Sequence, residues 1–441
     1  MKKGKRRMAA VLSLMLVPMM AACSSGGNNG NSGNSVGGET VDTLKEVKLK
    51  IGLPAAYDAT RKEIIDGFIA SHPHIKVDVQ DAPWGDFTAK IATQIAGNTA
   101  PDIWFQENAA ILGYGKRGVA EDLSAYIERD LKEEDYIEAL YAAKTPDGHV
   151  YGVPHGINPA ALAFNKKVFA AAGVSLPTDD WTFNDLIENA KLLTKKEAGS
   201  ETEIYGLAGT AGITQGWFPF IKMAGGQALD ETKTKAMFDN PQTIAGLQAM
   251  QDGVKEGYFT SREFVEAQGG DQATLANGKA AMYIIQYSNQ VTMNRNFPDA
   301  DWDVVKIPKS VDGNRYVPMV TNSWLIYSKA KPEVKEAAWE FLKYYLSEEA
   351  QALLAESGAA LPVNKAALAK VEQNTNKPLN KKAFTEGIAE SGTTLDENAS
   401  WNEWRGAAQP IITDIYDGKI SVSDAVKEIQ EKVQAVLDQN A

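Results

Sequence analysis

Alternating apolar positions and helical apolar stripes follow one another from residue 47 onward. Residues 47–53 place an apolar side chain at every second position, as in a half-buried strand, and residues 64–69 place apolar side chains at helical spacing. The same order recurs at 75–79 and 87–95, and a third short strand is expected at 102–105. Strand, helix, strand, helix and strand in this order predict right-handed βαβ crossovers in a largely parallel sheet.

The rest of the chain continues to alternate between short strands and amphipathic helices. Its 441 residues exceed the roughly 250–300 at which a single core stops growing, so we expect two α/β lobes. Thr182 and Pro332 are expected to begin helices, and Gly173 to end one. Further strands are expected at residues 149–154, 160–165, 281–285, 304–307 and 324–328, and helices at 217–224, 241–257, 264–276, 332–346 and 422–436.

The predicted sheet indicates where a ligand would bind. Ligands of open α/β sheets bind beyond the carboxyl ends of the strands. In the first part of the chain, the residues that follow the expected strands are Tyr57, Trp84, Gln106, Glu107 and Asn108. These side chains are the first candidates for a binding site.

The N-terminus has the pattern of an export signal. A basic stretch, an apolar stretch at 8–20 and small residues precede Cys23, the only cysteine, in an arrangement that resembles the lipobox of bacterial lipoproteins. We therefore expect a signal peptide at 1–22 and a lipid on Cys23. Residues 24–38 are Gly, Ser or Asn except Val36, so 23–45 is expected to be a flexible tether that holds the body outside a membrane.

Charge and cysteine content exclude several classes of function. The net charge is −12, and five of the 45 Lys and Arg residues lie within the first 22 positions, so the body is more acidic still. An acidic body repels phosphate backbones, and we expect no nucleic-acid partner. One cysteine allows neither an intramolecular disulfide nor a cysteine-based zinc site.

Most motifs that suggest catalysis lack their required context. The GxGxxG run at 113–118 follows a segment that looks helical, not a strand, so nucleotide binding is not expected. His72 and His74 lack a third metal ligand, and we expect no metal or cofactor. A carboxylate pair for glycoside hydrolysis stays open as an alternative, because a sequence gives no distances between its acids.

Aromatic residues beside polar ones favour a sugar ligand. The C–H face of a sugar ring stacks on an aromatic plane, and its hydroxyl rim needs amides and carboxylates. The planes that we select are Trp84, Trp217, Tyr287, Trp401 and Trp404, and the polar candidates are Gln106, Glu107, Asn108, Asn158, Gln286 and Asn322.

Not every tryptophan is a candidate for the site. Trp104, Trp302 and Trp339 lie within strand or helix patterns, so we expect them in the core. Trp401 and Trp404 lie in the polar run Asn-Ala-Ser-Trp-Asn-Glu-Trp-Arg at 398–405. For these two rings we expect a place at the cleft.

Eight short motifs in register resemble the family 1 extracellular solute-binding proteins of ABC importers, the maltodextrin-binding type. The resemblance covers nearly all of residues 46–438. The motifs are Ala100-Pro-Asp-Ile103, Tyr151-Gly-Val-Pro154, Phe164-Asn165-Lys166, Trp181-Thr182-Phe183, Ala224-Gly-Gly226, Asn277-Gly-Lys-Ala-Ala-Met282, Ala337-Ala-Trp-Glu-Phe-Leu342 and Leu361-Pro362.

The resemblance implies two lobes joined by three crossings. The lobes would be 46–155 plus 315–358 and 156–314 plus 359–441, with hinges near 155–158, 309–316 and 358–362. The family's stacking aromatic on a late helix falls on Trp401, and Trp217 matches an aromatic-rich loop. The polar pair that maltodextrin binders place after the third strand falls on Ala109 and Ala110, which makes maltose itself a poor candidate.

The expected function is that of a non-catalytic receptor. It would capture an oligosaccharide between two lobes, act as a monomer and deliver the sugar to the transmembrane permease subunits of an ABC importer, at the outer face of a bacterial cell membrane. Two alternatives stay open: a surface enzyme that acts on glycans, and a receptor of the same fold for a peptide or another polar solute.

Overall fold

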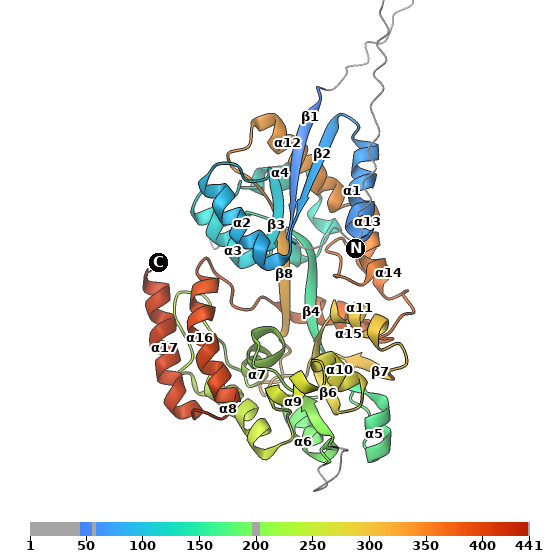
Figure 1. Ribbon diagram of the computed structural model, residues 1–441, viewed down its shortest axis with the longest axis vertical. Helices are drawn as coiled ribbons and strands as arrows, with labels where there is room; N and C mark the ends of the chain where they lie inside the picture. The colour runs from blue at the N-terminus through green and yellow to red at the C-terminus, as the bar shows by residue number, and fades with distance from the viewer. Residues whose placement is uncertain (1–44, 55–58, 146, 196–202, 440–441) are drawn as a thin grey trace, which may run out of the picture. The chain divides into compact units, whose positions relative to one another are not determined.

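The computed structural model of the chain describes residues 45–54, 59–145, 147–195 and 203–439, apart from the side chains at 84 and 85 (Figure 1). The expected signal peptide, Cys23, the tether and Tyr57 lie outside the described residues, as does the side chain of Trp84. Among the helices that are described, none is both long and apolar enough to cross a membrane.

The first strand group confirms the expected βαβ crossovers. Strand β1 (Val47–Leu53) pairs in parallel with β2 (Ile75–Asp81) on one side and β3 (Ile103–Glu107) on the other. Helices α1 (Ala59–Ser71) and α2 (Trp84–Ala96) connect these strands. Leu49, Ile51 and Leu53 of β1 are fully buried, as the alternating pattern requires, and Val47 at its start is partly buried.

Two long strands run from the first strand group to the second (Figure 1). Strand β4 (Val153–Asn165) is continuous where the sequence predicted two separate pieces, and it pairs antiparallel with β8 (Val317–Ile326). Pro154 and Pro159 made this strand hard to predict, because proline cannot donate to the ladder. A bulge between Pro154 and Gly156 shifts the register at this point.

The second strand group contains β5 (Tyr205–Ala208), β6 (Ala280–Gln286) and β7 (Trp302–Val305). Strands β5 and β6 are parallel, whereas β6 and β7 lie antiparallel to β4, and the short β9 (Gly392–Thr393) is parallel to β8. The strand order is β2-β1-β3-β8-β4-β6-β5. Every antiparallel pair involves β4 or β8, and the expected α/β class is confirmed.

Helices cover both strand groups at positions close to those expected. Thr182 caps α6 (Phe183–Leu193) with a complete capping box, since its side chain accepts from the Asp185 amide and the Asp185 side chain accepts from the Thr182 amide. The remaining helices are α3 (Asn108–Lys116), α4 (Ser124–Asp130), α5 (Lys166–Ala172), α6 (Phe183–Leu193), α7 (Phe218–Met223), α8 (Pro241–Glu256), α9 (Arg262–Ala267), α10 (Asp271–Ala276), α11 (Asn289–Asn296), α12 (Pro332–Tyr345), α13 (Glu348–Ser357), α14 (Lys365–Val371), α15 (Lys382–Ser391), α16 (Trp401–Tyr416) and α17 (Val422–Gln439).

The core accounts for the tryptophans that were expected to be structural. Trp104, Trp302 and Trp339 are each at most 1% exposed, which confirms their assignment to the core. Trp324 of β8 is also buried, with ring centroids 4.9 Å from Phe105 and 5.3 Å from Phe341. Aromatic packing around Trp324 thus connects β8 with β3 and with α12 (Pro332–Tyr345).

A single side chain joins β4, α5 and α10. Asn165 Oδ1 accepts from the amides of Lys167 at 3.0 Å and Val168 at 3.2 Å, and its Nδ2 donates to the Leu275 carbonyl at 2.9 Å. Asn165→Ala is expected to lower the free energy of unfolding by about 1–2 kcal/mol, because the helix cap is lost. Asn165→Asp keeps the cap and should lose less. Chemical denaturation measures both, and equal stability of wild type and Asn165→Ala would contradict this role.

Candidate functional site

The carboxyl end of β3 places polar groups in the interior with unused hydrogen-bonding capacity. Gln106 is 2% exposed, and its Nε2 donates to Thr88 Oγ1 at 3.2 Å. Asn108 is fully buried and donates from Nδ2 to Thr321 Oγ1. Gln106 Oε1 and Asn108 Oδ1 have no hydrogen-bond partner among the described residues. Such buried acceptors are costly unless a ligand or solvent supplies a donor.

Strand β8 adds a third acceptor next to this strand end. Asn322 lies opposite Glu107 in the antiparallel register and opposite Gly156 of β4 on its other side. Its Oδ1 is buried without a partner in the described part of the chain. The structure therefore brings four of the predicted polar residues together: Gln106, Glu107, Asn108 and Asn322.

The predicted residues Gln286 and Tyr287 lie at the end of β6, and Asn158 lies in the middle of β4, opposite Val320 of β8. Asn158 Oδ1 accepts a hydrogen bond from the backbone amide of Ser288 at 2.8 Å, so the side chain of Asn158 already has a backbone partner. Gln286 is half-buried, opposite Ala160 of β4. Tyr287 is fully buried. Burial raises the pKa of its hydroxyl to about 12.

The expectation that polar surroundings keep Trp401 and Trp404 out of the core is wrong. Trp401 is 3% exposed and Trp404 is 0% exposed, and their rings meet edge to face at 5.0 Å. Residues 401–416 form α16, in which positions 401, 404, 408, 411 and 415 share the buried face, whereas Asn402 and Glu403 are exposed. Helical periodicity, not local polarity, decides the burial of these rings.

Trp217 is buried as well. It is 0% exposed at the end of the turn Ile213–Trp217, and its Nε1 donates to Gln409 Oε1 of α16 at 3.1 Å. None of the three described tryptophans selected as candidate planes therefore offers an open ring face in this structure.

A pocket of about 460 Å³ lies between the end of β3 and the start of α16; we call it the strand-end pocket. Two guanidinium groups stand over aromatic rings here, Arg117 over Tyr114 at 5.2 Å and Arg405 over Trp401 at 5.5 Å. The pocket is lined by Thr88, Gln106, Glu107, Ala109, Ala110, Gly113, Tyr114, Arg117, Ala399, Asn402, Glu403 and Arg405.

Helix α3 closely approaches the segment before α16. A Cβ at Gly113 would lie 3.3 Å from the carbonyl oxygen of Ala399, and a Cβ at Gly115 would overlap the Tyr151 ring at 2.3 Å. Gly118 has a φ of +67° after the helix. The helical context expected for the GxGxxG run is confirmed, and its glycines serve packing and helix termination.

A larger pocket of about 930 Å³ lies on the other side of this contact; we call it the lysine-lined pocket. Lys233 occupies its rim with a φ of +56°, and its Nζ donates to the Glu397 carbonyl at 3.0 Å. The pocket is lined by Leu112, Lys116, Ala142, Lys144, Thr145, Asp147, Tyr151, Glu231, Thr232, Lys233, Thr234, Lys235, Thr394, Glu397, Asn398, Ala399, Ser400, Gln434, Leu437 and Asp438.

Glu397 is the most unusual acid of this region. It is 5% exposed, and its Oε2 has no hydrogen-bond partner among the described residues. Burial raises the pKa of its carboxyl to about 8; Lys233 and Arg405 oppose this shift, and Glu107 adds to it. At neutral pH the group is therefore mostly an uncharged acid that can donate a hydrogen bond.

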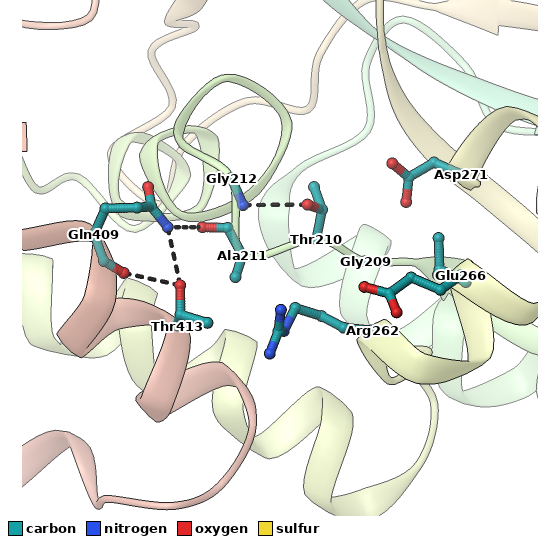
Figure 2. A pocket seen from close by; sticks show the side chains of 10 residues that line it. Gly209, Thr210, Ala211, Gly212, Arg262, Glu266, Asp271, Gln409 and Thr413 are labelled. Atoms are coloured by element: carbon teal, nitrogen blue, oxygen red, sulfur yellow. Dashed lines mark hydrogen bonds between the residues drawn. The ribbon is translucent and has the colours of Figure 1, made fainter. Parts of the chain in front are cut away.

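A third pocket of about 320 Å³ contains none of the predicted site residues (Figure 2). Loop 209–212 after β5, helices α9 and α10, and Gln409 with Thr413 of α16 surround it. Arg262 is held by Asp417 through two contacts of 2.7 and 2.6 Å. Gln409 is likewise engaged, since its Nε2 donates to the Ala211 carbonyl at 2.7 Å.

Sequence reasoning selected Glu107 but missed three other charged residues of the two pockets beside α3: Arg117, Arg405 and Glu397. Arg117 follows α3, whereas Glu397 and Arg405 lie on either side of the start of α16, nearly 300 positions further along the chain. Arg405 follows Trp404 directly in the polar run at 398–405, so that run was a sequence signal for a charged side chain at the pocket. In the residues that are described, no three His, Cys, Asp or Glu side chains gather as metal ligands.

Comparison with known proteins shows the family. A model described as "Bacterial extracellular solute-binding protein" matches residues 63–382. The diacetylchitobiose-binding protein DasA of Streptomyces coelicolor is 26% identical over 467 aligned positions that cover 99% of each chain. The maltodextrin-binding protein MdxE of Bacillus subtilis is 24% identical and covers 77% of this chain and 79% of its own.

Solved structures show the same fold. The substrate-binding protein Lmo0181 from Listeria monocytogenes, solved in complex with cycloalternan, superimposes with a TM-score of 0.78 at 23% identity, covering 89% of this chain and 100% of its own. The sugar-binding protein MalE of Xanthomonas citri superimposes with a TM-score of 0.76 at 18% identity, over 89% and 98% of the two chains.

Proposed function

We propose, on the premise that this chain belongs to the bacterial extracellular solute-binding proteins, that it is a receptor for an oligosaccharide. In this proposal the sugar is captured between two lobes and passed to the permease subunits of an ABC importer. The names of the relatives support this choice of ligand, since the proteins of Streptomyces coelicolor and Bacillus subtilis bind diacetylchitobiose and maltodextrin.

The strand-end pocket is the observation that carries the proposal. Residues of β3 and α3 form one wall, and residues at the start of α16 form the other. Amides, carboxylates and guanidinium groups of both walls suit sugar hydroxyls, which both donate and accept. The unpartnered Gln106 Oε1 is an acceptor that one hydroxyl would satisfy.

We propose that the lobes are 46–155 plus 315–358 and 156–314 plus 359–441, and that they rotate about 155–158, 309–316 and 358–362. Hinge closure around a ligand is a known route to sequestering it. Small-angle scattering with and without sugar tests this motion: a smaller radius of gyration is expected at saturation. An unchanged radius would contradict it.

A thermal-shift screen of the full-length protein tests the proposed ligand. Neutral, acidic and amino-sugar oligosaccharides are each added, and a sugar at 100 times its dissociation constant is expected to stabilise the fold by about 2.7 kcal/mol. Chromatography of the same mixtures detects turnover. Intact sugars support a receptor, cleaved sugars would favour the glycan-active alternative, and a screen in which only peptides stabilise the protein would reject the sugar.

Membrane attachment is proposed to depend on Cys23. The arrangement of residues 1–23 and the single thiol support lipidation there, and one relative, from Streptomyces antibioticus, is called a lipoprotein. Cys23→Ala is expected to move the protein from the membrane to the soluble fraction or to leave the leader uncleaved. A mutant that is still processed and sediments with membranes would reject this attachment.

A further inference from the structure

His149 lies between two carboxylates, one on each side of its ring. Its Nδ1 is 2.7 Å from Asp122 Oδ2, and its Nε2 is 3.9 Å from Asp147 Oδ2. The side chain of His149 is 49% exposed, so water reaches the ring. An acid therefore faces each of the two ring nitrogens.

The protonation state of the ring decides how many of these contacts are favourable. A neutral imidazole carries one N–H group, whereas the imidazolium carries two. When the neutral ring donates from Nδ1 to Asp122, its Nε2 presents a lone pair to Asp147, and these two acceptors repel each other. The imidazolium alone favours both carboxylates. The hydrogen bond to Asp122 and the charges of Asp122 and Asp147 raise the pKa of His149 above its ordinary value of 6.5.

The two acids belong to separate segments of the chain. Asp122 precedes α4, and its Oδ1 accepts from the Ser124 amide at 3.0 Å and from the Ser124 hydroxyl at 2.6 Å. Asp147 lies two positions before His149, whose own amide donates to Thr145 Oγ1 at 3.1 Å. The ring therefore connects the segment 147–149 to the segment before α4.

The residues that follow His149 are held without the help of its ring. The Leu123 amide donates to the Val150 carbonyl at 2.7 Å, and the Val150 amide donates to Ser124 Oγ at 3.1 Å. Lys144 and Val150 also form an antiparallel bridge. Loss of the imidazolium is therefore expected to loosen the segment 147–149 and not the paired residues beside it.

This segment belongs to the wall of the lysine-lined pocket. Thr145 and Asp147 both line that pocket, and the Tyr151 ring lies 6.1 Å from the His149 ring. A smaller pocket of about 340 Å³ lies on the Gly148 side. Besides the two acids, the charged and titratable groups around the segment are Lys144, Tyr151, Glu128 and Glu133.

We propose that His149 is a pH-dependent clip at the lysine-lined pocket. As an imidazolium it holds Asp122 through Nδ1 and Asp147 through Nε2, and so fixes the segment 147–149. As a neutral ring it keeps Asp122 and releases Asp147. This inference goes beyond the proposed function and does not depend on the ligand.

The proposal predicts order at acid pH and loosening at alkaline pH. Aspartates are ionised above about pH 5, so both acids are charged over the range in which a histidine titrates. The contact with Asp147 is present while His149 is charged and is lost as the pH rises through the pKa of His149. Because that pKa is raised, the loss is expected above pH 6.5.

Nuclear magnetic resonance of the imidazole rings tests the two contacts in the full-length protein in detergent. The chain has four histidines, and His149→Gln identifies the signal of His149. Its titration midpoint is expected above pH 6.5 in the wild type and lower in Asp147→Asn, which removes the charge and keeps the shape. Asp86→Asn, at an exposed acid of α2, is the control and should leave the midpoint unchanged. The same midpoint in wild type and Asp147→Asn would overturn the proposal.

Amide hydrogen exchange tests whether the clip orders the segment. The Gly148 amide donates to the Thr145 carbonyl at 2.9 Å, and its protection is compared at pH 5.5 and pH 8.5 relative to the intrinsic exchange rate at each pH. We expect roughly 2- to 5-fold less protection at pH 8.5, the range typical of an exposed ion pair. His149→Gln cannot become charged and should show no change with pH, whereas His74→Gln should behave like the wild type.

The exchange experiment has two results that would reject the clip. One is equal protection of the wild type at both pH values, and the other is the same loss of protection in His149→Gln. Neither measurement involves a sugar, so a failure of the clip leaves the proposed receptor function standing.

Discussion

Trp401→Ala is expected to weaken oligosaccharide binding by roughly 5- to 150-fold. Stacking of a base on an aromatic ring is worth about 1–3 kcal/mol by alanine substitution, a scale that we transfer to a sugar ring, and each 1.4 kcal/mol is about tenfold in affinity. Trp401 begins α16, and the next two residues, Asn402 and Glu403, line the strand-end pocket; Arg405 lies over the Trp401 ring at 5.5 Å and the Trp404 ring meets it at 5.0 Å.

The same change is expected to cost stability, because the ring is 3% exposed. Replacing a buried tryptophan by alanine typically costs about 3–5 kcal/mol. Trp404→Ala is the matched control, since Trp404 is equally buried one helical turn further along. It should lose comparable stability and retain sugar affinity. Equal losses of affinity in both variants, measured by calorimetry below their melting temperatures, would assign Trp401 to the core alone.

Glu397→Gln is expected to stabilise the fold most at alkaline pH, by up to about 5 kcal/mol at pH 8–9. The pKa of Glu397 is raised from an ordinary glutamate's value to about 8, and each pKa unit corresponds to about 1.4 kcal/mol. Its folded pKa, about 8, lies above its unfolded value. The native state therefore holds a proton that the unfolded chain releases between about pH 4.5 and 8, so wild-type stability falls as the pH rises through this window.

Glutamine removes this dependence of stability on pH, because its side-chain amide does not ionise between pH 4 and pH 9. Urea denaturation of wild type and Glu397→Gln at pH 4 and pH 9 measures the effect. The two proteins should be similar at pH 4 and differ at pH 9, with the variant more stable. A Glu397→Asp variant keeps the titration and is the control. A variant that is no more stable than wild type at pH 9 would show that Glu397 ionises without cost.

The order of the elements was predictable because it depends on local periodicity. Alternation at 47–53, the capping box at Thr182 and the helix begun by Pro332 are all signals within a few residues. Strand β4 was harder, because two prolines interrupt it and its continuity comes from pairing with β8, which is more than 150 positions away.

The site was only partly predictable, because some of its residues follow from local sequence signals and others are brought together only by long-range packing. The end of β3 follows from the topology of a parallel sheet, so Gln106, Glu107 and Asn108 could be selected in advance. Their neighbours Arg405 and Glu397 come from the far end of the chain, and only packing brings them close. The burial of Trp401 was predicted wrongly, because local polarity was given more weight than the helical spacing of the apolar residues.

Hydrogen exchange tests most directly whether a sugar is held between α3 and the start of α16. The full-length protein is compared with and without an oligosaccharide that stabilises it in the thermal-shift screen. The account predicts slower amide exchange in both segments, 106–117 and 397–405, and little change around Arg262. Protection confined to one of the two segments, or centred on loop 209–212 and α9, would contradict it.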